Sequence, residues 1–161
     1  MTPSPDHRNF RNALGRFATG VTIITGRDAQ GRDIGLTANS FSSVSLDPPL
    51  VLWSIAKSSS QFAAFQEAAH FTIHVLAADQ ADLSARFSKR GSDRFEGLDH
   101  PRGAGGAMLL PGCAARFQCK TAQRHECGDH VIMIGEVIDF DASEAEPLAF
   151  HGGRIRSLAA T

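Results

Sequence analysis

The sequence predicts a mostly β protein, a closed or split antiparallel β-barrel with a few short helices. Strand-like segments outnumber helical ones, and short turns join them as hairpins. No long alternation of strands with helices is present, which disfavours a parallel sheet. The 161 residues contain no internal repeat, so we expect one domain over residues 10–161 behind a flexible N-terminal arm at residues 1–9.

Six segments rich in β-branched and apolar side chains predict the strands, over residues 21–25, 34–38, 50–55, 71–76, 114–125 and 130–140. Turn residues predict hairpins between the first two and between the last two, the latter turning at residues 126–129. The run at 50–55 is almost continuously apolar, which is typical of a strand buried on both faces, whereas 71–76 alternates. The tail at 150–155 is expected to return as a last short strand or loop.

Three short helices are expected. The first has an apolar stripe at helical spacing, made of Phe10, Leu14 and Phe17. The second follows serines 58–60, which can supply an N-cap, and the third follows Asp79, which can do the same. The Gly-rich segment at 91–112 is long enough to form a functional or mobile loop.

Composition excludes several classes of protein. The net charge of −1 argues against a general nucleic-acid binder, which needs a clustered basic surface. No apolar run approaches the roughly 20 residues that span a bilayer, and the first residues lack the pattern of a signal peptide. We therefore expect a cytoplasmic protein without a membrane partner. Three cysteines without a Cys-x-x-Cys pair predict reduced, buried thiols rather than a disulfide framework.

The first segment suited to ligand binding is residues 35–44, where a strand gives way to small hydroxyl and amide residues. Such residues let backbone N–H groups approach a planar polar ligand, and their side chains add hydrogen bonds. The alternative is a Ser-rich edge strand or loop that binds nothing.

The second segment is residues 54–60, which places Lys57 and three serines just before a helix. A helix N-terminus favours anions, so this segment could hold a phosphate, although an ordinary N-cap beside a solvated lysine is the simpler interpretation. Because the two segments are expected at the ends of neighbouring strands, one ligand could reach both.

Two further segments are polar. Residues 86–90 end a helix and form either a solvated charge cluster or a phosphate contact. Residues 125–130 contain the residue types of a zinc site, but their spacing matches no standard finger, so a polar hairpin at a barrel mouth is favoured and no metal is predicted. The P-loop, the Gly-x-Ser-x-Gly elbow and a dinucleotide-binding glycine fingerprint are all missing.

From Phe10 to Ile155, the chain resembles the short-chain flavin reductases, which have the FMN-binding split-barrel fold. The resemblance rests on residues 17–25, on Arg86-Phe87, on Gly128-Asp129-His130 and, most specifically, on the block from Gly35-Leu36-Thr37-Ala38-Asn39-Ser40 to Pro48-Pro49-Leu50-Val51. It implies a homodimeric oxidoreductase that reduces FMN or FAD with NADH or NADPH. It also implies a partner, a separate flavin-dependent oxygenase that receives the reduced flavin.

The resemblance also implies roles for individual residues. Contacts to the isoalloxazine are implied for Thr37, Ala38, Asn39 and Ser40, with Ser42 and Ser43 beside them. The ribityl and phosphate side is implied for Ser54, Ile55, Ala56, Lys57 and Ser60. Arg86 and Phe87 would close the flavin site. The nicotinamide end is implied for His130, the predicted catalytic residue, with His151 and Arg154 from the tail.

Hydride transfer is chemistry intrinsic to nicotinamide and flavin, so the protein needs chiefly to align them, which agrees with the lack of an acid–base dyad. Two alternatives stay open: a non-catalytic flavin-binding redox module, and a structural protein with zinc in the hairpin. The sequence does not choose between FMN and FAD, or between NADH and NADPH.

Overall fold

The computed structural model describes residues 6–158 and contains mainly strands. The elements in chain order are α1 (His7–Leu14), β1 (Thr19–Gly20), β2 (Thr22–Arg27), β3 (Asp33–Ala38), β4 (Ser42–Leu46), β5 (Pro49–Ala56), α2 (Phe62–Glu67), β6 (His70–Val75), α3 (Ala81–Ser88), a 3-10 turn η1 (Ala104–Gly106), β7 (Ala115–Cys127), β8 (His130–Ala142), β9 (Ala149–His151) and β10 (Arg154–Arg156). All six predicted strands are present, and the tail forms the β9–β10 hairpin where one short strand or loop was expected.

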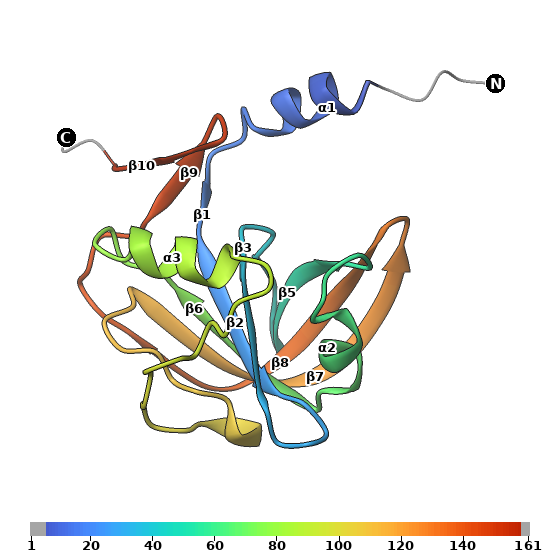
Figure 1. Cartoon of the computed structure of the whole chain (residues 1–161), viewed down its shortest axis with the longest axis vertical. Coiled ribbons are helices and arrows are strands. Elements are labelled where there is room, and N and C mark those ends of the chain that lie inside the picture. Colours follow the sequence, from blue (N-terminus) through green and yellow to red (C-terminus); the bar gives the residue numbers. More distant parts are fainter. Residues whose placement is uncertain (1–5, 159–161) are drawn as a thin grey trace.

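Seven strands form one sheet in the order β3-β2-β6-β7-β8-β5-β4, and every neighbouring pair is antiparallel. A small second sheet has the order β1-β9-β10. The large sheet is strongly curved (Figure 1), but its two edge strands, β3 and β4, do not pair with each other. The prediction of a mostly β, antiparallel fold with few helices is therefore confirmed, and the sheet does not close into a barrel.

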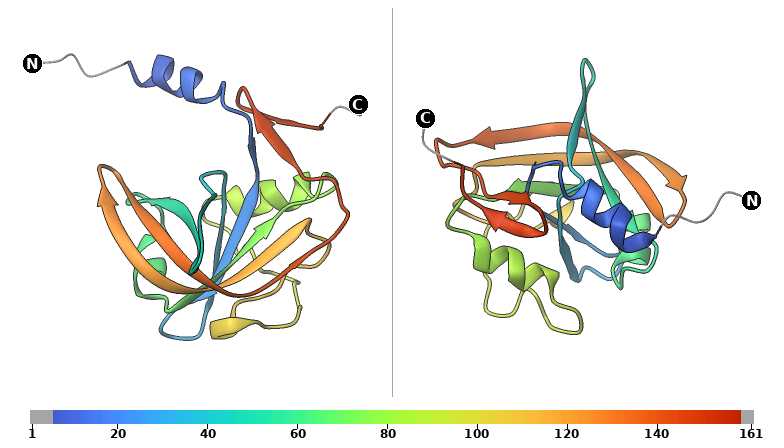
Figure 2. Two further views of the ribbon diagram at one scale, coloured as in Figure 1. Left: turned by 180° about the vertical axis from the view of Figure 1, so that it is seen from behind. Right: turned by 90° about the horizontal axis from the view of Figure 1, so that it is seen from above.

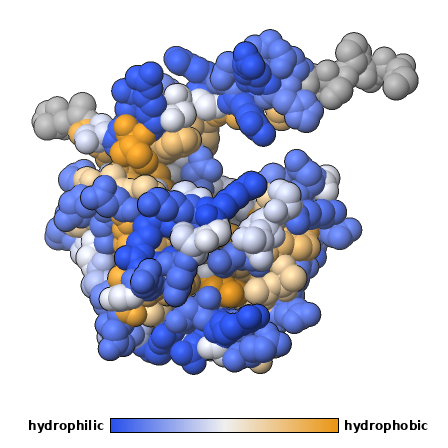
Figure 3. Space-filling model, in the orientation of Figure 1, coloured by the Kyte–Doolittle hydropathy of each residue, from blue (hydrophilic) through white to orange (hydrophobic). Residues whose placement is uncertain are grey.

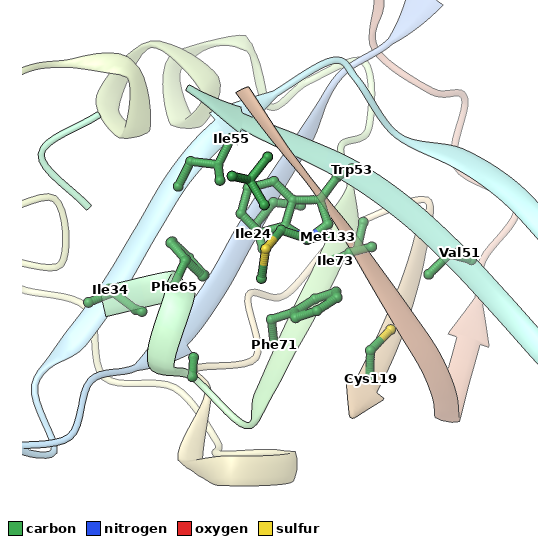
Figure 4. Close-up of a cluster of buried hydrophobic side chains, with 12 residues drawn as sticks. Ile24, Ile34, Val51, Trp53, Ile55, Phe65, Phe71, Ile73, Cys119 and Met133 are labelled. Atoms are coloured by element: carbon green, nitrogen blue, oxygen red, sulfur yellow. The ribbon is translucent and has the colours of Figure 1, made fainter. Parts of the chain in front are cut away.

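The main core lies inside the curve of the sheet, where α2 covers it (Figure 4). Trp53 of β5 makes edge-to-face contacts with Phe65 of α2 and Phe71 of β6, with ring centroids 5.1 Å and 5.8 Å away. Such contacts add to the burial of three large apolar side chains, so they fix α2 against the sheet.

The burial of β5 and β6 is the reverse of what their sequences predict. On β5, only Val51, Trp53 and Ile55 are buried, and the residues between them are half-exposed, so burial alternates along the strand. On β6, four consecutive residues are buried, over 71–74.

Strand β6 is buried on both faces because the Gly-rich segment packs on the outer face of β2 and β6. Thr25 Oγ1 donates to the Met108 carbonyl at 2.8 Å, and Leu110 N–H donates to His74 Nε2 at 3.1 Å. Polar residues of a strand are expected to face water, but here the loop supplies their hydrogen bonds and buries them. A second cluster of buried side chains forms beside this loop and under α3, made of Val21, Ile23, Leu76, Phe87, Met108, Leu110 and Leu148.

Helix α1 begins earlier than expected, because Asp6 caps it by accepting a hydrogen bond from Arg8 N–H at 3.0 Å. Residues 7–9 of the expected arm are therefore helical, and residues 1–5 lie outside the described part of the chain. No residue of α1 is buried, and Phe10 and Leu14 of its apolar stripe are both exposed. Figure 3 shows the helix standing clear of the body of the molecule.

The other helix starts also differ from expectation. The N-cap of α2 is Gln61, and the N-cap of α3 is Gln80 rather than Asp79; neither side chain caps its own helix. Strands β7 and β8 have 13 residues each and form a long hairpin that turns at Gly128-Asp129. Gly128 takes the positive φ of 62° that such a turn requires. No helix among residues 6–158 is long and apolar enough to cross a membrane.

Candidate functional site

A cavity of about 360 Å³ opens where the two ends of the curved sheet approach each other. Its walls come from the end of β3, the end of β5, the turn before α2, the end of α3 with the loop that follows, and the start of β8. The lining residues are Leu36, Thr37, Ala38, Asn39, Ser40, Ser54, Ile55, Ala56, Ser58, Ser59, Ser60, Phe87, Ser88, Arg90, Arg94 and His130. The structure thus brings together ten of the sixteen residues predicted from the sequence.

The ends of β3 and β5 meet through a single serine. Ser40 Oγ accepts a hydrogen bond from Ser54 N–H at 2.9 Å and donates to the Ser54 carbonyl at 3.2 Å. We expected these segments on neighbouring strands, but β3 and β5 are separated by four strands in the sheet order. Curvature of the sheet, visible in both views of Figure 2, brings them together instead.

The rim at the end of β3 uses most of its hydroxyl groups to hold the fold. Thr37 Oγ1 donates to the Ser84 carbonyl of α3 at 2.7 Å, and the Ala38 carbonyl accepts from Thr22 Oγ1 at 2.6 Å. The Asn39 side chain has no hydrogen-bond partner within residues 6–158. A ligand at this rim would therefore meet backbone groups, the Asn39 amide and the wall of the cavity.

The turn before α2 brings three serines to the cavity but leaves Lys57 outside its lining. Lys57 Nζ lies 3.7 Å from Glu126 Oε1 on the β7–β8 hairpin, so its charge already has a partner. Helix α2 has only six residues, too few for its N-terminus to attract an anion strongly. The predicted role of Lys57 in phosphate binding remains a prediction, and the structure offers other cations for it.

Two arginines on the loop after α3, Arg90 and Arg94, line the cavity together with the serines. Arg90 ends the segment 86–90 that the sequence analysis considered for a phosphate contact, whereas Arg94 was not identified from the sequence. Arg94 is 8% exposed; its Nε donates to the Lys89 carbonyl at 2.9 Å and its Nη1 to the Gly35 carbonyl at 2.6 Å. Arg94 lies in the segment Ser92-Asp93-Arg94-Phe95, where no pattern separates a buried arginine from a solvated one.

Arg86 supports this loop rather than lining the cavity. Its Nε donates to the Arg94 carbonyl at 2.7 Å and its Nη2 to the Glu96 carbonyl. Phe87 lies beneath the cavity, fully buried, and stacks edge-to-face on Phe95 with centroids 5.0 Å apart. Close packing explains Gly35, because a Cβ there would come within 2.8 Å of Phe95 Cζ and 2.9 Å of Phe87 Cε1.

His130 faces the cavity from the start of β8, next to the hairpin turn. Its Nδ1 lies 2.7 Å from Asp129 Oδ1, and this hydrogen bond lowers the pKa of the Asp129 carboxyl below its usual value. The carboxylate therefore fixes the imidazole ring, as carboxylates do for histidines in many polar sites.

Four other predicted residues do not line this cavity. Ser42 and Ser43 are exposed on the edge strand β4, and His151 and Arg154 pair with each other's backbone in the β9–β10 hairpin. Arg86 and Lys57 complete the six predicted residues that lie outside the cavity lining. Their assignment to ligand binding stays untested.

A second hollow of about 230 Å³ adjoins the first. It shares Thr37, Ala38, Asn39 and Ser88 with the first cavity, and Phe150 and Ile155 of the β9–β10 sheet add apolar walls to it. Two ligands could thus meet along the rim at the end of β3.

The cysteines and the hairpin show no ligand set of their own. Burial raises the pKa of Cys113 to about 11 and that of Cys119 to about 12, so both thiols are protonated at neutral pH, while Cys127 is exposed, contrary to expectation. Across residues 6–158, no three His, Cys, Asp or Glu side chains are grouped to hold a metal ion.

Comparisons with known proteins agree with this geometry. The family model described as a flavin reductase like domain matches residues 14–159. The chain is 55% identical over 146 residues to FMN reductase (NADH) SmoA of Agrobacterium fabrum, covering 91% of this chain and 83% of that protein. It is 43% identical over 146 residues to the reductase component of the flavin-dependent trigonelline monooxygenase of Acinetobacter baylyi, covering 91% of this chain but only 47%, about half, of that protein.

Among solved structures, the chain resembles the NADH:FAD oxidoreductase SgcE6 of Streptomyces globisporus in complex with NAD and FAD fragments. The two chains have a TM-score of 0.90 and 36% sequence identity, covering 97% of this chain and 95% of the other.

Proposed function

The chain belongs to the flavin reductase like domain family, and from this premise we propose that it is an NADH-dependent flavin reductase whose flavin substrate is FMN. A bound flavin supplies a ring system that accepts a hydride from a reduced nicotinamide. The protein's own contribution is to hold the two molecules in contact and to keep them oriented.

The observation that supports this proposal best is the division of the cavity into two chemically different ends. At one end, the β3 rim offers backbone groups and Asn39 to a flat polar ring. At the other, Gly35 N–H donates to Gln61 Oε1 at 2.6 Å and the Gly35 carbonyl accepts from Arg94 Nη1 at 2.6 Å, which brings the turn with serines 58–60 close to Arg94. Arg90 lines the same cavity, and no Asp or Glu does. A flavin mononucleotide has the same two ends, a polar ring system and a phosphate, so the residues fit this group.

The proposed roles follow from position. Thr37, Ala38 and Asn39 would contact the flavin ring, and Ser54 to Ala56 would border the chain that leads to the phosphate. His130, oriented by Asp129, would contact the nicotinamide, and the adjoining hollow with Phe150 gives a second molecule room beside the rim. We keep His151 and Arg154 as proposals for the nicotinamide side.

The named relatives support NADH and FMN as the first pair to test. One relative is named for FMN reduction with NADH, and the Streptomyces structure contains NAD and FAD fragments, so FAD is the second flavin to test. We infer NADH rather than NADPH as the donor on the strength of these names alone.

We also propose a separate flavin-dependent oxygenase as the consumer of the reduced flavin, because a relative is the reductase component of a monooxygenase. The substrate of that oxygenase leaves no trace in this chain.

A homodimer is supported by the apolar surface that this chain leaves uncovered. Helix α1 has eight residues and buries none of them, whereas isolated helices of that length are marginal in water. Phe17 is 78% exposed and Leu46, at the tip of the β4–β5 hairpin, is 95% exposed. A second copy of the chain is the proposed cover. Analytical ultracentrifugation should give twice the mass of the chain, and Phe17→Glu should shift the equilibrium toward monomer while Arg8→Glu on the same segment should not.

The decisive experiment is steady-state oxidation of NADH and of NADPH with FMN, FAD and riboflavin in turn. We expect NADH oxidation that depends on added flavin and is fastest with FMN. Flavin binding without NADH oxidation would instead support the non-catalytic redox module, and the absence of both would overturn the proposed function.

A further inference from the structure

The guanidinium of Arg94 is a buried positive charge without a negative partner. The residue as a whole is 8% exposed, and its side chain forms no ion pair within residues 6–158. The neighbouring Asp93 forms no ion pair with Arg94, and its Oδ1 accepts a hydrogen bond from Phe95 N–H at 2.9 Å. Burial lowers the pKa of Arg94, yet an arginine keeps its charge, so the folded protein bears a desolvation cost that no carboxylate offsets.

The hydrogen bonds of Arg94 leave part of its donor set unused. Its Nε and Nη1 donate to the carbonyls of Lys89 and Gly35, which fixes the plane of the guanidinium at the cavity wall. Its Nη2 has no hydrogen-bond partner among the described residues and is not fully enclosed by the protein. A guanidinium held rigidly in this way, with donors to spare, suits a phosphate well.

The surroundings of Arg94 have the same preference. Ser58, Ser60 and Arg90 line the cavity with it, and the described residues contain no hydrogen-bond partner for the hydroxyls of Ser58 and Ser60. Two cations and free hydroxyl groups without a carboxylate describe an anion site.

We propose that Arg94 binds the phosphate of FMN and thereby makes this site select phosphorylated flavins over riboflavin. This proposal rests on the proposed function for the identity of the ring, but the anion site itself rests only on the residues above. Its competitor is a purely structural role, in which Arg94 only ties its loop to β3.

The two roles differ in what they do to riboflavin, which has the flavin ring and ribityl chain but no phosphate. Isothermal titration calorimetry should show FMN binding to the unmodified protein at least tenfold more tightly than riboflavin. Loss of a charged hydrogen bond corresponds to roughly a 10- to 100-fold change in the dissociation constant. Arg94→Met should therefore raise the Kd for FMN by about that factor and the Kd for riboflavin by less than about threefold.

Three variants serve as controls. Arg86→Met loosens the same loop without touching the cavity, so it should weaken both ligands by the same factor. Arg32→Met removes an exposed arginine paired with Asp28 and should change neither. Arg94→Lys keeps the charge but loses the paired donors of the guanidinium, so its Kd for FMN should lie between those of the parent and of Arg94→Met. It also replaces Arg94→Met if that variant does not fold.

A second measurement needs no flavin. Inorganic phosphate should raise the melting temperature of the parent protein and should do so less for Arg94→Met, each compared with chloride at equal ionic strength. Equal weakening of FMN and riboflavin by Arg94→Met, or an equal response of parent and variant to phosphate, would overturn the proposal. If the parent bound neither flavin but phosphate protected it through Arg94, the proposed function would fail and the anion site would stand.

Discussion

The sheet and the loops that surround the cavity use their polar side chains in opposite ways. On the strands, Thr37 and His74 have their hydrogen-bonding groups engaged by the backbone of other segments, and so does Ser40, just past the end of β3. On the loops and turns, Arg94 Nη2 and the Ser58 hydroxyl have no hydrogen-bond partner among residues 6–158, and both residues line the cavity. Residues with engaged groups hold the fold together, whereas residues with spare groups can recognise a ligand. This difference predicts which measurement each substitution should change.

His74 should give the largest effect, and it should appear in stability alone. Its Nδ1 donates to the Ile23 carbonyl at 3.1 Å and its Nε2 accepts from Leu110 N–H. Burial lowers the pKa of His74 from 6.5 to about 4, and the hydrogen bond to Ile23 opposes this shift only in part. A neutral ring is required in the folded state, while the unfolded state gains a proton below pH 6.5. The free energy of unfolding should therefore be fully retained above pH 6.5 and should fall by on the order of 2 kcal/mol between pH 7 and pH 5.

Urea denaturation across that pH range measures this change. In His74→Gln the lost imidazole should flatten the pH dependence, although the variant is less stable at pH 7. An equally steep pH dependence in the variant would assign the effect to other groups.

His130 should change turnover and leave flavin binding alone. Its ring is held by Asp129 and borders the cavity, where it can contact a nicotinamide. His130→Ala should lower kcat/KM for NADH by about tenfold or more, the worth of one oriented hydrogen bond, and should change the Kd for FMN by less than about threefold. Asp129→Asn retains the imidazole with a weaker anchor, so it should show a smaller loss of the same kind. A parallel loss of flavin affinity would place His130 on the flavin instead.

Ser40 is a residue with engaged groups inside the cavity wall, and it tests the comparison directly. Ser40→Ala removes two hydrogen bonds to Ser54 and leaves the Ser54 N–H unpaired, which should cost about 1–2 kcal/mol of stability. Because the Ser40 hydroxyl already bonds Ser54, its loss should raise the Kd values for FMN and riboflavin by equal factors as the rim loosens. Ser42→Ala, at an exposed position on β4, is the matched control for stability and should show no change in urea.

Lys57 should give the smallest effect. Its ammonium group is paired with Glu126 near the surface, and such pairs contribute little. Lys57→Ala should raise the Kd for FMN by less than about threefold, whereas Arg94→Met should raise it at least tenfold. A larger effect at Lys57 than at Arg94 would restore the assignment that the sequence alone favours.

Much of the fold was accessible from the sequence, because local patterns determine it. Residues 21–25 and 34–38 have strand composition with turn residues between them, and the structure pairs them as predicted. What the sequence could not supply was the long-range arrangement. The polar residues Thr72 and His74 gave β6 the pattern of a half-exposed strand, and only the packing of the loop near Met108 and Leu110 shows that both are buried.

The site divides in the same way. The rim from Thr37 to Ser40 follows a strand and contains small polar residues, so composition and order were enough to predict it. Arg94 lies in a loop of ordinary polar composition, and its importance depends on burial and on the lack of a carboxylate partner. Both are properties of the folded chain. Lys57 shows the converse, a basic residue next to serines whose charge the hairpin of β7 and β8 takes up.

Trp53 gives the molecule a built-in optical reporter. It is the only tryptophan, and the sequence has no tyrosine. The indole is fully buried in the core on β5, directly before three residues that line the cavity. Near-ultraviolet excitation therefore addresses one chromophore in one apolar environment. A yellow ligand in the cavity would quench the Trp53 emission by energy transfer, so occupancy of the site can be followed by the fluorescence of this one residue.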